Sequence, residues 1–182
     1  MSDGPPRALF VGRFQPFHRG HLETIRAIRR GRPAEVVLIG IGSAQESYTR
    51  ENPFTAGERF EMIELSLQEA HLSDVIPVPI PDIHRHALWV RYVEGLLPPF
   101  ARVYTNNPLT RILFETGGYT VESPTLFERE RWEGMQIRAA LERGSPVDSL
   151  VPPAVAQWLD RHQAPARLRS IGENWATPSR RP

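Results

Sequence analysis

Two histidines three residues apart are the side chains of this sequence best placed to do chemistry. His18 and His21 flank Gly20, and Arg13 precedes them. If a helix begins here, this spacing puts both imidazoles on one side of its first turn. Gly20 leaves the backbone open to close approach, and the helix start adds free N–H groups and a positive dipole end. Such a site would bind an anion, and phosphoryl and nucleotidyl transfers depend on positioning and electrostatic stabilisation of this kind.

Taken by itself, the H-x-x-H spacing leaves simpler interpretations open. His18 and His21 can also be loop and helix-cap residues with no ligand. Zinc is a weaker alternative, because two histidines are too few ligands and no cysteine or nearby carboxylate cluster completes the shell. We therefore expect no protein-held metal. The sequence has no lysine, which excludes a P-loop lysine, so arginine, histidine, backbone amides or a metal must hold any anion.

The elements that must position these residues alternate along the chain. Apolar runs without strict alternation are typical of strands covered on both faces, and they occupy residues 8–12, 35–42, 75–80, 102–105 and 119–122. Helical spacing follows, with a capping-box pair at Thr55 and Glu58, over residues 22–28, 55–70, 88–97, 109–115, 135–143 and 154–162. This alternation predicts an α/β fold, a Rossmann-like doubly wound parallel sheet with C-terminal helices.

Bulk properties indicate one globular domain. The chain has 182 residues, of which 40% are hydrophobic and 24% charged. We expect a tail over residues 1–7, the domain over 8–163 and an Arg- and Pro-rich tail over 164–182, because both ends lack periodicity. A net charge of +1 gives no general attraction to nucleic acid or a membrane. The sequence lacks cysteine, a signal-peptide pattern and a bilayer-length apolar stretch, so a cytoplasmic location is expected.

Ligands of such sheets bind beyond the carboxyl ends of the strands, which makes the residues after each strand further candidates. These segments are polar or small, and they are GRFQPFHRGH at 12–21, GSAQ at 42–45, PDI at 81–83 and TNNP at 105–108. The run GIGSAQ at 40–45 half-matches a dinucleotide fingerprint. It follows the second strand and lacks the third glycine, so it does not indicate a dehydrogenase.

The segment GRFQPFHRGH resembles the H-x-G-H signature of the nucleotidyltransferase superfamily, and its form is similar to that of the archaeal-type nicotinamide mononucleotide (NMN) adenylyltransferases. Residues 41–45, 51–59, 82–83, 87–90 and 98–100 resemble the same family in the same order, so the resemblance covers roughly residues 7–145. It implies transfer of AMP from ATP to NMN, giving NAD and pyrophosphate, with Mg²⁺ carried by ATP or pyrophosphate and no covalent enzyme intermediate. It also implies a homo-oligomer, often a hexamer in this family.

The resemblance gives roles to individual residues. The catalytic set that would hold the ATP phosphates and the transition state is His18, His21, Arg13 and Arg138. Trp89 would stack on the nicotinamide ring as a cation–π contact, and Asp82 would lie near NMN. The residues that would line the ATP and nucleotide cleft are Gly12, Phe14, Gln15, Gly20, Ser43, Gln45, Asn106, Asn107 and Gly134. Without the resemblance, Trp89 fits a core position, Asp82 a helix cap and the two asparagines a turn.

The sequence departs from the family at the second signature, S-x-T-x-x-R. Glu133 and Met135 stand at its hydroxyl positions, while Gly134 and Arg138 are retained. Each lost donor to a charged ligand costs about 1.5–3 kcal/mol if nothing replaces it.

Three interpretations of this departure stay open. Helix amides and the arginines at 129, 131 and 138 compensate and activity survives, which the intact first signature favours. Alternatively, the acceptor is another phosphorylated molecule, such as a pantetheine phosphate or flavin mononucleotide. Finally, the protein binds nucleotides without turnover, as a sensor. The choice between NMN and nicotinic acid mononucleotide also stays open.

Overall fold

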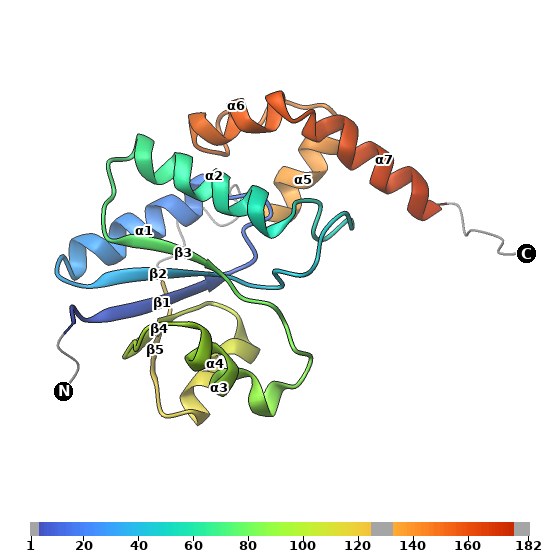
Figure 1. Ribbon diagram of the computed structural model, residues 1–182. Coiled ribbons are helices and arrows are strands. Elements are labelled where there is room, and N and C mark those ends of the chain that lie inside the picture. The colour runs from blue at the N-terminus through green and yellow to red at the C-terminus, as the bar shows by residue number, and fades with distance from the viewer. Residues whose placement is uncertain (1–3, 125–132, 177–182) are drawn as a thin grey trace, which may run out of the picture.

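A five-stranded parallel sheet forms the centre of the protein (Figure 1). The computed structural model describes residues 4–124 and 133–176. The strands are β1 (Arg7–Gly12), β2 (Val36–Ile41), β3 (Val75–Pro79), β4 (Arg102–Tyr104) and β5 (Thr120–Glu122). Their order across the sheet is β3-β2-β1-β4-β5, and every neighbouring pair is parallel. All five expected strands are therefore confirmed, each within about a residue of the expected bounds.

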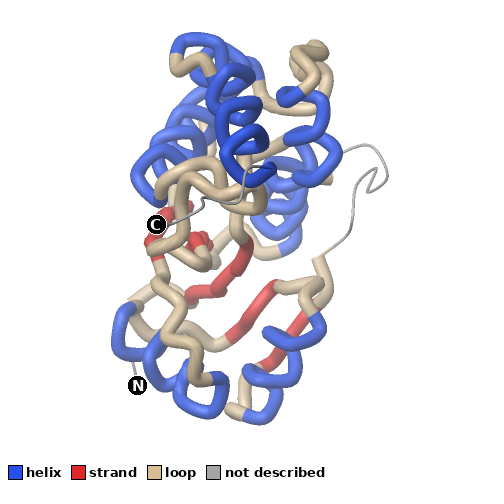
Figure 2. The backbone as a smooth tube through the Cα atoms, turned by 90° about the vertical axis from the view of Figure 1, so that its right-hand side faces the viewer, coloured by secondary structure: helices blue, strands red, loops and turns tan. Residues whose placement is uncertain are grey.

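Helices cover both faces of this sheet (Figures 1 and 2). One face carries α1 (Arg19–Gly31), α2 (Ala56–Glu69), α5 (Gly134–Glu142), α6 (Pro153–Arg161) and α7 (Ala164–Ala176). The other face carries α3 (His86–Leu96) and α4 (Pro108–Thr116). Two separate clusters of buried apolar side chains fill the spaces on either side of the sheet. Both faces of β2 are buried, which explains why its sequence VVLIGI shows no alternation.

Local sequence signals set where several helices begin and end. Thr55 accepts a hydrogen bond from the backbone N–H of Glu58, whose side chain accepts one from Thr55 in return, so the expected capping box opens α2. Asn107 caps α4 in the same way through the N–H of Thr110. After α5 the chain turns at Gly144, whose φ of +71° is a left-handed conformation that favours glycine.

The sheet changes winding direction between β1 and β4. The chain leaves β1 for α1 on one face, whereas it leaves β4 for α4 on the opposite face (Figure 1). In a doubly wound sheet, this is the place where a crevice opens beyond the carboxyl ends of the two strands. Gly12 ends β1 and Thr105 follows β4, so the candidate segments at 12–21 and 105–108 meet there.

Both expected tails need correction. Arg7 is already the first residue of β1, where its carbonyl accepts from the N–H of Ala101. Residues 164–176 form α7 and pack against the domain, with Ala164 and Leu168 buried in the core. Arg167, which lies within the expected tail, makes an ion pair with Glu58 at 2.8 Å. The periodicity was weak because only one edge of α7 is buried. Among the described residues, no helix is long and apolar enough to cross a membrane.

Candidate active site

The two histidines lie at the first turn of α1, as expected from their spacing. His18 is the N-cap, with extended backbone angles, and His21 lies on the first turn. Their rings stack, with centroids 3.5 Å apart and planes 21° from parallel. The backbone N–H of His18 donates to Nδ1 of His21 at 3.3 Å. An accepting Nδ1 carries no proton, so neutral His21 carries its proton on Nε2, where it can donate to a phosphate oxygen.

Burial keeps both imidazoles neutral in the free protein. His18 is buried and its Nδ1 has no hydrogen-bond partner in the described structure. Burial lowers the pKa of His18 to about 4. The pKa of His21 is lowered well below its usual value, first by burial and then by the adjacent His18. The rings of Phe14 and Phe17 enclose His21, with centroids 4.7 and 5.5 Å from it. Positive charge at the site therefore comes from arginines.

A cavity of about 250 Å³ opens beside the stacked rings. We name it the histidine cavity. Asparagines 106 and 107, which follow β4, also line it, as does the start of α5. The residues that line it are Phe10, Val11, Gly12, His18, Gly20, His21, Thr24, Thr105, Asn106, Asn107, Pro124, Glu133 and Gly134. Sequence-expected residues from three separate segments thus meet around one space.

A second cavity, of about 320 Å³, adjoins the first and is called the tryptophan cavity. Trp89 is half-buried in its wall and packs edge-on against Phe114 at 5.5 Å. The full lining is Val11, Gly12, Arg13, Gly42, Ser43, Asp82, His86, Trp89, Asn107, Leu109, Thr110 and Leu113. The two cavities share Val11, Gly12 and Asn107, so they meet between the ends of β1 and β4. Ligands occupying the two cavities would therefore both contact these shared residues.

Asp82 and His86 line the tryptophan cavity together with Trp89. Asp82 does not cap a helix, because Arg85 is the N-cap of α3. Instead, its Oδ1 accepts from the backbone N–H of His84 at 3.0 Å. His86 is exposed in the first turn of α3, three residues before Trp89 and on the same side. His86 was not among the predicted site residues, although its spacing from Trp89 was a usable signal.

The two arginines among the catalytic candidates line different cavities, and neither lines the histidine cavity. Arg13 lines the tryptophan cavity instead of the histidine cavity. Arg138 donates from Nη1 to the carbonyl of Gln15 at 2.8 Å, which ties α5 to the first signature. Burial lowers the pKa of Arg138, and the nearby Arg13 lowers it further. A Cβ at Gly134 would lie 3.2 Å from Nη1 of Arg138 and 3.4 Å from the Gln15 carbonyl. Glycine permits this close approach.

Three residues expected at the nucleotide lie beside the cavities and outside their walls. Phe14 is buried against Gly12 and the His21 ring. Gln15 is buried as well, and its amide pairs with both backbone groups of Phe54 at 2.9 and 3.1 Å. The amide of Gln45 pairs with the backbone of Asp82 at 2.7 and 3.2 Å. The amides of Gln15 and Gln45 thus have polar partners within the protein, and all three side chains hold the loops that carry the cavities.

Proteins of known family share the sequence that forms this arrangement. A nicotinamide-nucleotide adenylyltransferase of Picrophilus torridus is 48% identical over 168 residues, covering 92% of this chain and 98% of the relative. One of Methanolobus tindarius is 44% identical over 168 residues, covering 92% and 95%. The family described as cytidylyltransferase-like matches residues 9–140. The chain belongs to this family. The resemblance inferred from the signature segments is thereby confirmed.

Solved structures show that the cytidylyltransferase-like chain also shares its fold with more distant proteins. A bifunctional NMN adenylyltransferase/ADP ribose pyrophosphatase from Francisella tularensis, complexed with AMP and a manganese ion, superposes with a TM-score of 0.72 at 19% identity. The alignment covers 98% of this chain, which spans only 58% of the length of that bifunctional protein. At this identity the likeness concerns the fold.

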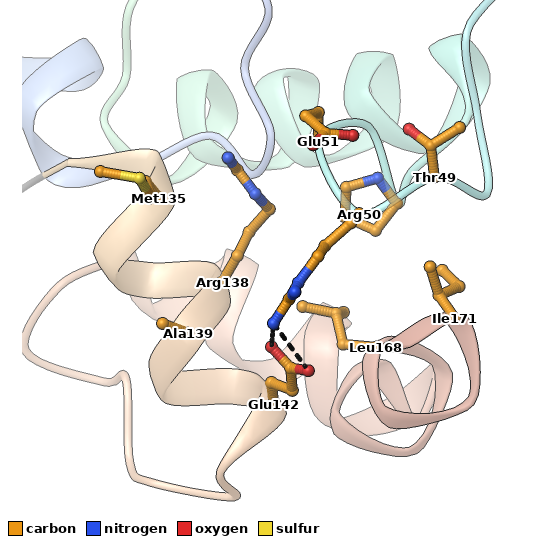
Figure 3. Close-up of a pocket in the computed structure, with 10 residues that line it drawn as sticks. Thr49, Arg50, Glu51, Met135, Arg138, Ala139, Glu142, Leu168 and Ile171 are labelled. Atoms are coloured by element: carbon orange, nitrogen blue, oxygen red, sulfur yellow. Dashed lines mark hydrogen bonds and ion pairs between the residues drawn. The ribbon is translucent and has the colours of Figure 1, made fainter. Parts of the chain in front are cut away.

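The second signature of this cytidylyltransferase-like protein keeps its helix start and loses its hydroxyls. Glu133 is the N-cap of α5 but its side chain makes no capping hydrogen bond, and it lines the histidine cavity. Met135 is 62% exposed. It lies with Arg138 at the edge of a third cavity, of about 320 Å³, where Arg50 pairs with Glu142 at 3.4 Å (Figure 3). The arginines at 129 and 131, named as possible compensators, lie outside the described residues.

Arg59 is a further residue of the site region that was not predicted. Arg59 of α2 is completely buried, and its guanidinium donates to backbone carbonyls of the loops after β1 and β2. A signal existed, because Arg59 falls on the same helical stripe as the buried residues Ile63, Ser66 and Leu67. An arginine on an apolar stripe must find many acceptors or a counter-ion.

Proposed function

We propose that this protein transfers the AMP moiety of ATP to nicotinamide mononucleotide, giving NAD and pyrophosphate. The observation that supports this most directly is the meeting of two cavities at Gly12 and Asn107. One has imidazole donors and a helix start suited to phosphates, and the other has an indole face suited to a cationic ring. Relatives that match nearly the whole chain carry the corresponding name.

In this proposal ATP occupies the histidine cavity and NMN the tryptophan cavity. A phosphate oxygen of NMN forms a bond to the α-phosphorus of ATP, and the bond from that phosphorus to the bridging oxygen breaks, releasing pyrophosphate with the electron pair. The nucleophile is already an anion, so no general base is needed. The protein's contribution is to align two anions that repel each other. Nε2–H of His21 would donate to the reacting phosphate, and the arginines would offset its charge.

Mg²⁺ is proposed as a part of the substrate. Within residues 4–124 and 133–176, no group of three or more His, Cys, Asp or Glu side chains is placed to hold an ion. The phosphates of ATP and pyrophosphate would therefore supply its ligands, and the ion would neutralise charge as the leaving group departs.

Assembly into a homo-oligomer also stays a prediction, which sedimentation or light scattering of the purified protein would check.

An assay of NAD formation from ATP, NMN and Mg²⁺ tests the proposal. We expect turnover, with a higher kcat/KM for NMN than for a pantetheine phosphate or flavin mononucleotide. Nicotinic acid mononucleotide is assayed in parallel, because the acceptor cavity alone does not decide between the two pyridines. ATP binding without formation of any dinucleotide would instead indicate a sensor.

The indole of Trp89 provides a sharper test of the acceptor cavity. Removing it in Trp89→Ala should raise the KM for NMN about tenfold, the equivalent of a cation–π contact of about 1–2 kcal/mol, and leave the KM for ATP nearly unchanged. NMN should also quench tryptophan emission in the wild type and not in the variant. Leu88→Ala is the matched control, since Leu88 is an exposed neighbour on α3 that lines neither cavity. An equal rise in KM for both substrates would remove NMN from this cavity.

A further inference from the structure

The buried guanidinium of Arg59 links the two loops that carry the candidate site. Its Nη1 donates to the carbonyls of Arg13 at 3.0 Å and Gly42 at 2.8 Å, and its Nη2 donates to that of Ser43 at 3.1 Å. Nε donates to the carbonyl of Thr55, at the start of its own helix, at 3.2 Å. One planar group therefore fixes the end of β1, the end of β2 and the start of α2 relative to one another.

The loops that Arg59 holds contain strained backbone. Phe14 has a φ of 52° and Ser43 a φ of 47°, and both are left-handed conformations that a residue with a Cβ adopts at a cost of about 1–3 kcal/mol. Each lies within one residue of a carbonyl that Arg59 binds. Ser43 lines the tryptophan cavity, and Phe14 packs on the ring of His21. The surroundings must hold these conformations in place, and Arg59 contacts both loops directly.

In the part of the chain that the structure describes, no carboxylate pairs with this buried cation. Among the described residues Arg59 forms no ion pair, and all the partners found for its guanidinium are backbone carbonyls. Burial lowers its pKa to about 10, with a further contribution from the nearby Arg13, so it stays protonated at neutral pH. A protonated group with no counter-ion is costly to bury, and carbonyl dipoles meet only part of that cost.

We infer that Arg59 is a positioning residue for the transfer reaction. By holding the loops after β1 and β2 together, it sets the spacing of the two substrate cavities. This inference rests on the proposed function for its substrates. Arg59 lines neither cavity, so it acts through Arg13, Phe14 and Ser43 and not by touching ATP or NMN.

The first test is Arg59→Lys, which keeps the positive charge and loses the planar guanidinium with its N–H donors in several directions. A lysine ammonium cannot reach carbonyls in three directions with fixed geometry. Per folded molecule, measured by circular dichroism, kcat should fall at least tenfold and the KM for NMN should rise at least threefold. Arg102→Lys is the matched control. Arg102 is a largely buried arginine at the start of β4 that forms ion pairs with Glu35 and Glu122 and lines neither cavity. That variant should lower the melting temperature and leave both kinetic constants unchanged.

A second pair of variants covers the case in which Arg59→Lys does not fold. Ser43→Gly removes the side chain and frees the left-handed backbone, whereas Ser43→Ala removes only the hydroxyl. If spacing of the loops matters, Ser43→Gly should raise the KM for NMN severalfold above the value for Ser43→Ala. Equal constants for these two variants, or a folded Arg59→Lys enzyme with wild-type kcat and KM, would overturn the inference.

These outcomes stay distinguishable from failure of the proposed function. If the wild type forms no NAD, the transfer reaction itself is wrong. In that case the positioning role of Arg59 is tested by ATP binding instead, measured as the rise in melting temperature that ATP produces. The rise should be smaller for Arg59→Lys than for Arg102→Lys. An equal rise for both variants would overturn the role of Arg59 as well.

Discussion

The two signature regions of this protein hold their groups in different ways. Residues of the first signature, from Gly12 to His21, are buried or half-buried except for Arg13, and some are bound to other segments, as the pairing of Gln15 with the backbone of Phe54 shows. The second signature, from Glu133 to Arg138, places Met135 largely in solvent and leaves Glu133 without a capping hydrogen bond. Its firm connection to the site is the hydrogen bond from Arg138 to the Gln15 carbonyl.

This difference indicates which parts of the proposed phosphate site tolerate change. A donor held by buried neighbours is preorganised, and its loss removes an interaction that costs no reorganisation during the reaction. A hydroxyl on an exposed helix start contributes less, because water competes for it and backbone amides lie beside it. Substitution of the hydroxyls by Glu133 and Met135 is therefore compatible with activity, provided that His18, His21 and Arg138 stay in place.

The largest effect is expected in the first signature. His21→Ala removes the Nε2–H donor and should lower kcat by about 10²–10³, with a much smaller change in the KM for NMN. Steady-state kinetics at saturating ATP would measure both. His162→Ala is the control, because that histidine stacks on Trp158 at 3.9 Å in α6 and lines neither cavity. Equal losses of kcat in the two variants would mean that His21 acts only through folding.

A second expectation concerns acid stability. The folded-state pKa of His18, about 4, lies below the ordinary value of 6.5, so the unfolded chain binds more protons between these pH values. The free energy of unfolding should thus be unaffected by His18 above pH 6.5 and fall by about 3 kcal/mol as the pH drops toward 4.

Denaturant unfolding of the wild type and His18→Asn at several pH values would measure this loss. The variant should show a flatter profile over the same range. Parallel profiles would mean that His18 keeps an ordinary pKa and that its ring is not shielded from water. A histidine of that kind could carry charge to the phosphates, and the first signature would then resemble the second in being open to solvent.

Much of this architecture follows from short-range sequence signals. The capping box at Thr55 and Glu58, the apolar runs and the stop at Gly144 all report local physics, so the strands and helices were predictable. The order of strand ends placed the site at the edge of the sheet, and the signature segments supplied the histidines. Here sequence and structure agree because each signal depends on residues close in the chain.

Long-range partners were not predictable from the same signals. Nothing in the sequence around Gln15 shows that its amide pairs with the backbone of Phe54, 39 residues away, instead of lining the nucleotide cavity. Burial of α7 depends on α5 and α6 already being in place, so its weak periodicity resembled a tail. Arg59 shows the same limit, since its role depends on where three loops converge. Pair contacts between distant segments decide these cases, and local patterns do not encode them.

The smallest expected effect tests the second signature by restoring what it lacks. In the variant carrying both Glu133→Ser and Met135→Thr, two hydroxyls return to the start of α5 and a negative charge leaves the wall of the histidine cavity. Each hydroxyl can donate to a phosphate, but exposure at position 135 reduces its contribution. The KM for ATP should therefore fall between about threefold and tenfold, with kcat changed by less than about threefold. Glu133→Gln alone separates removal of the charge from gain of the donors. If the KM for ATP stays constant in both variants, Arg138 and the helix amides already supply all the phosphate contacts at this end of the site. If the KM for ATP rises, Glu133 and Met135 form contacts of their own with ATP.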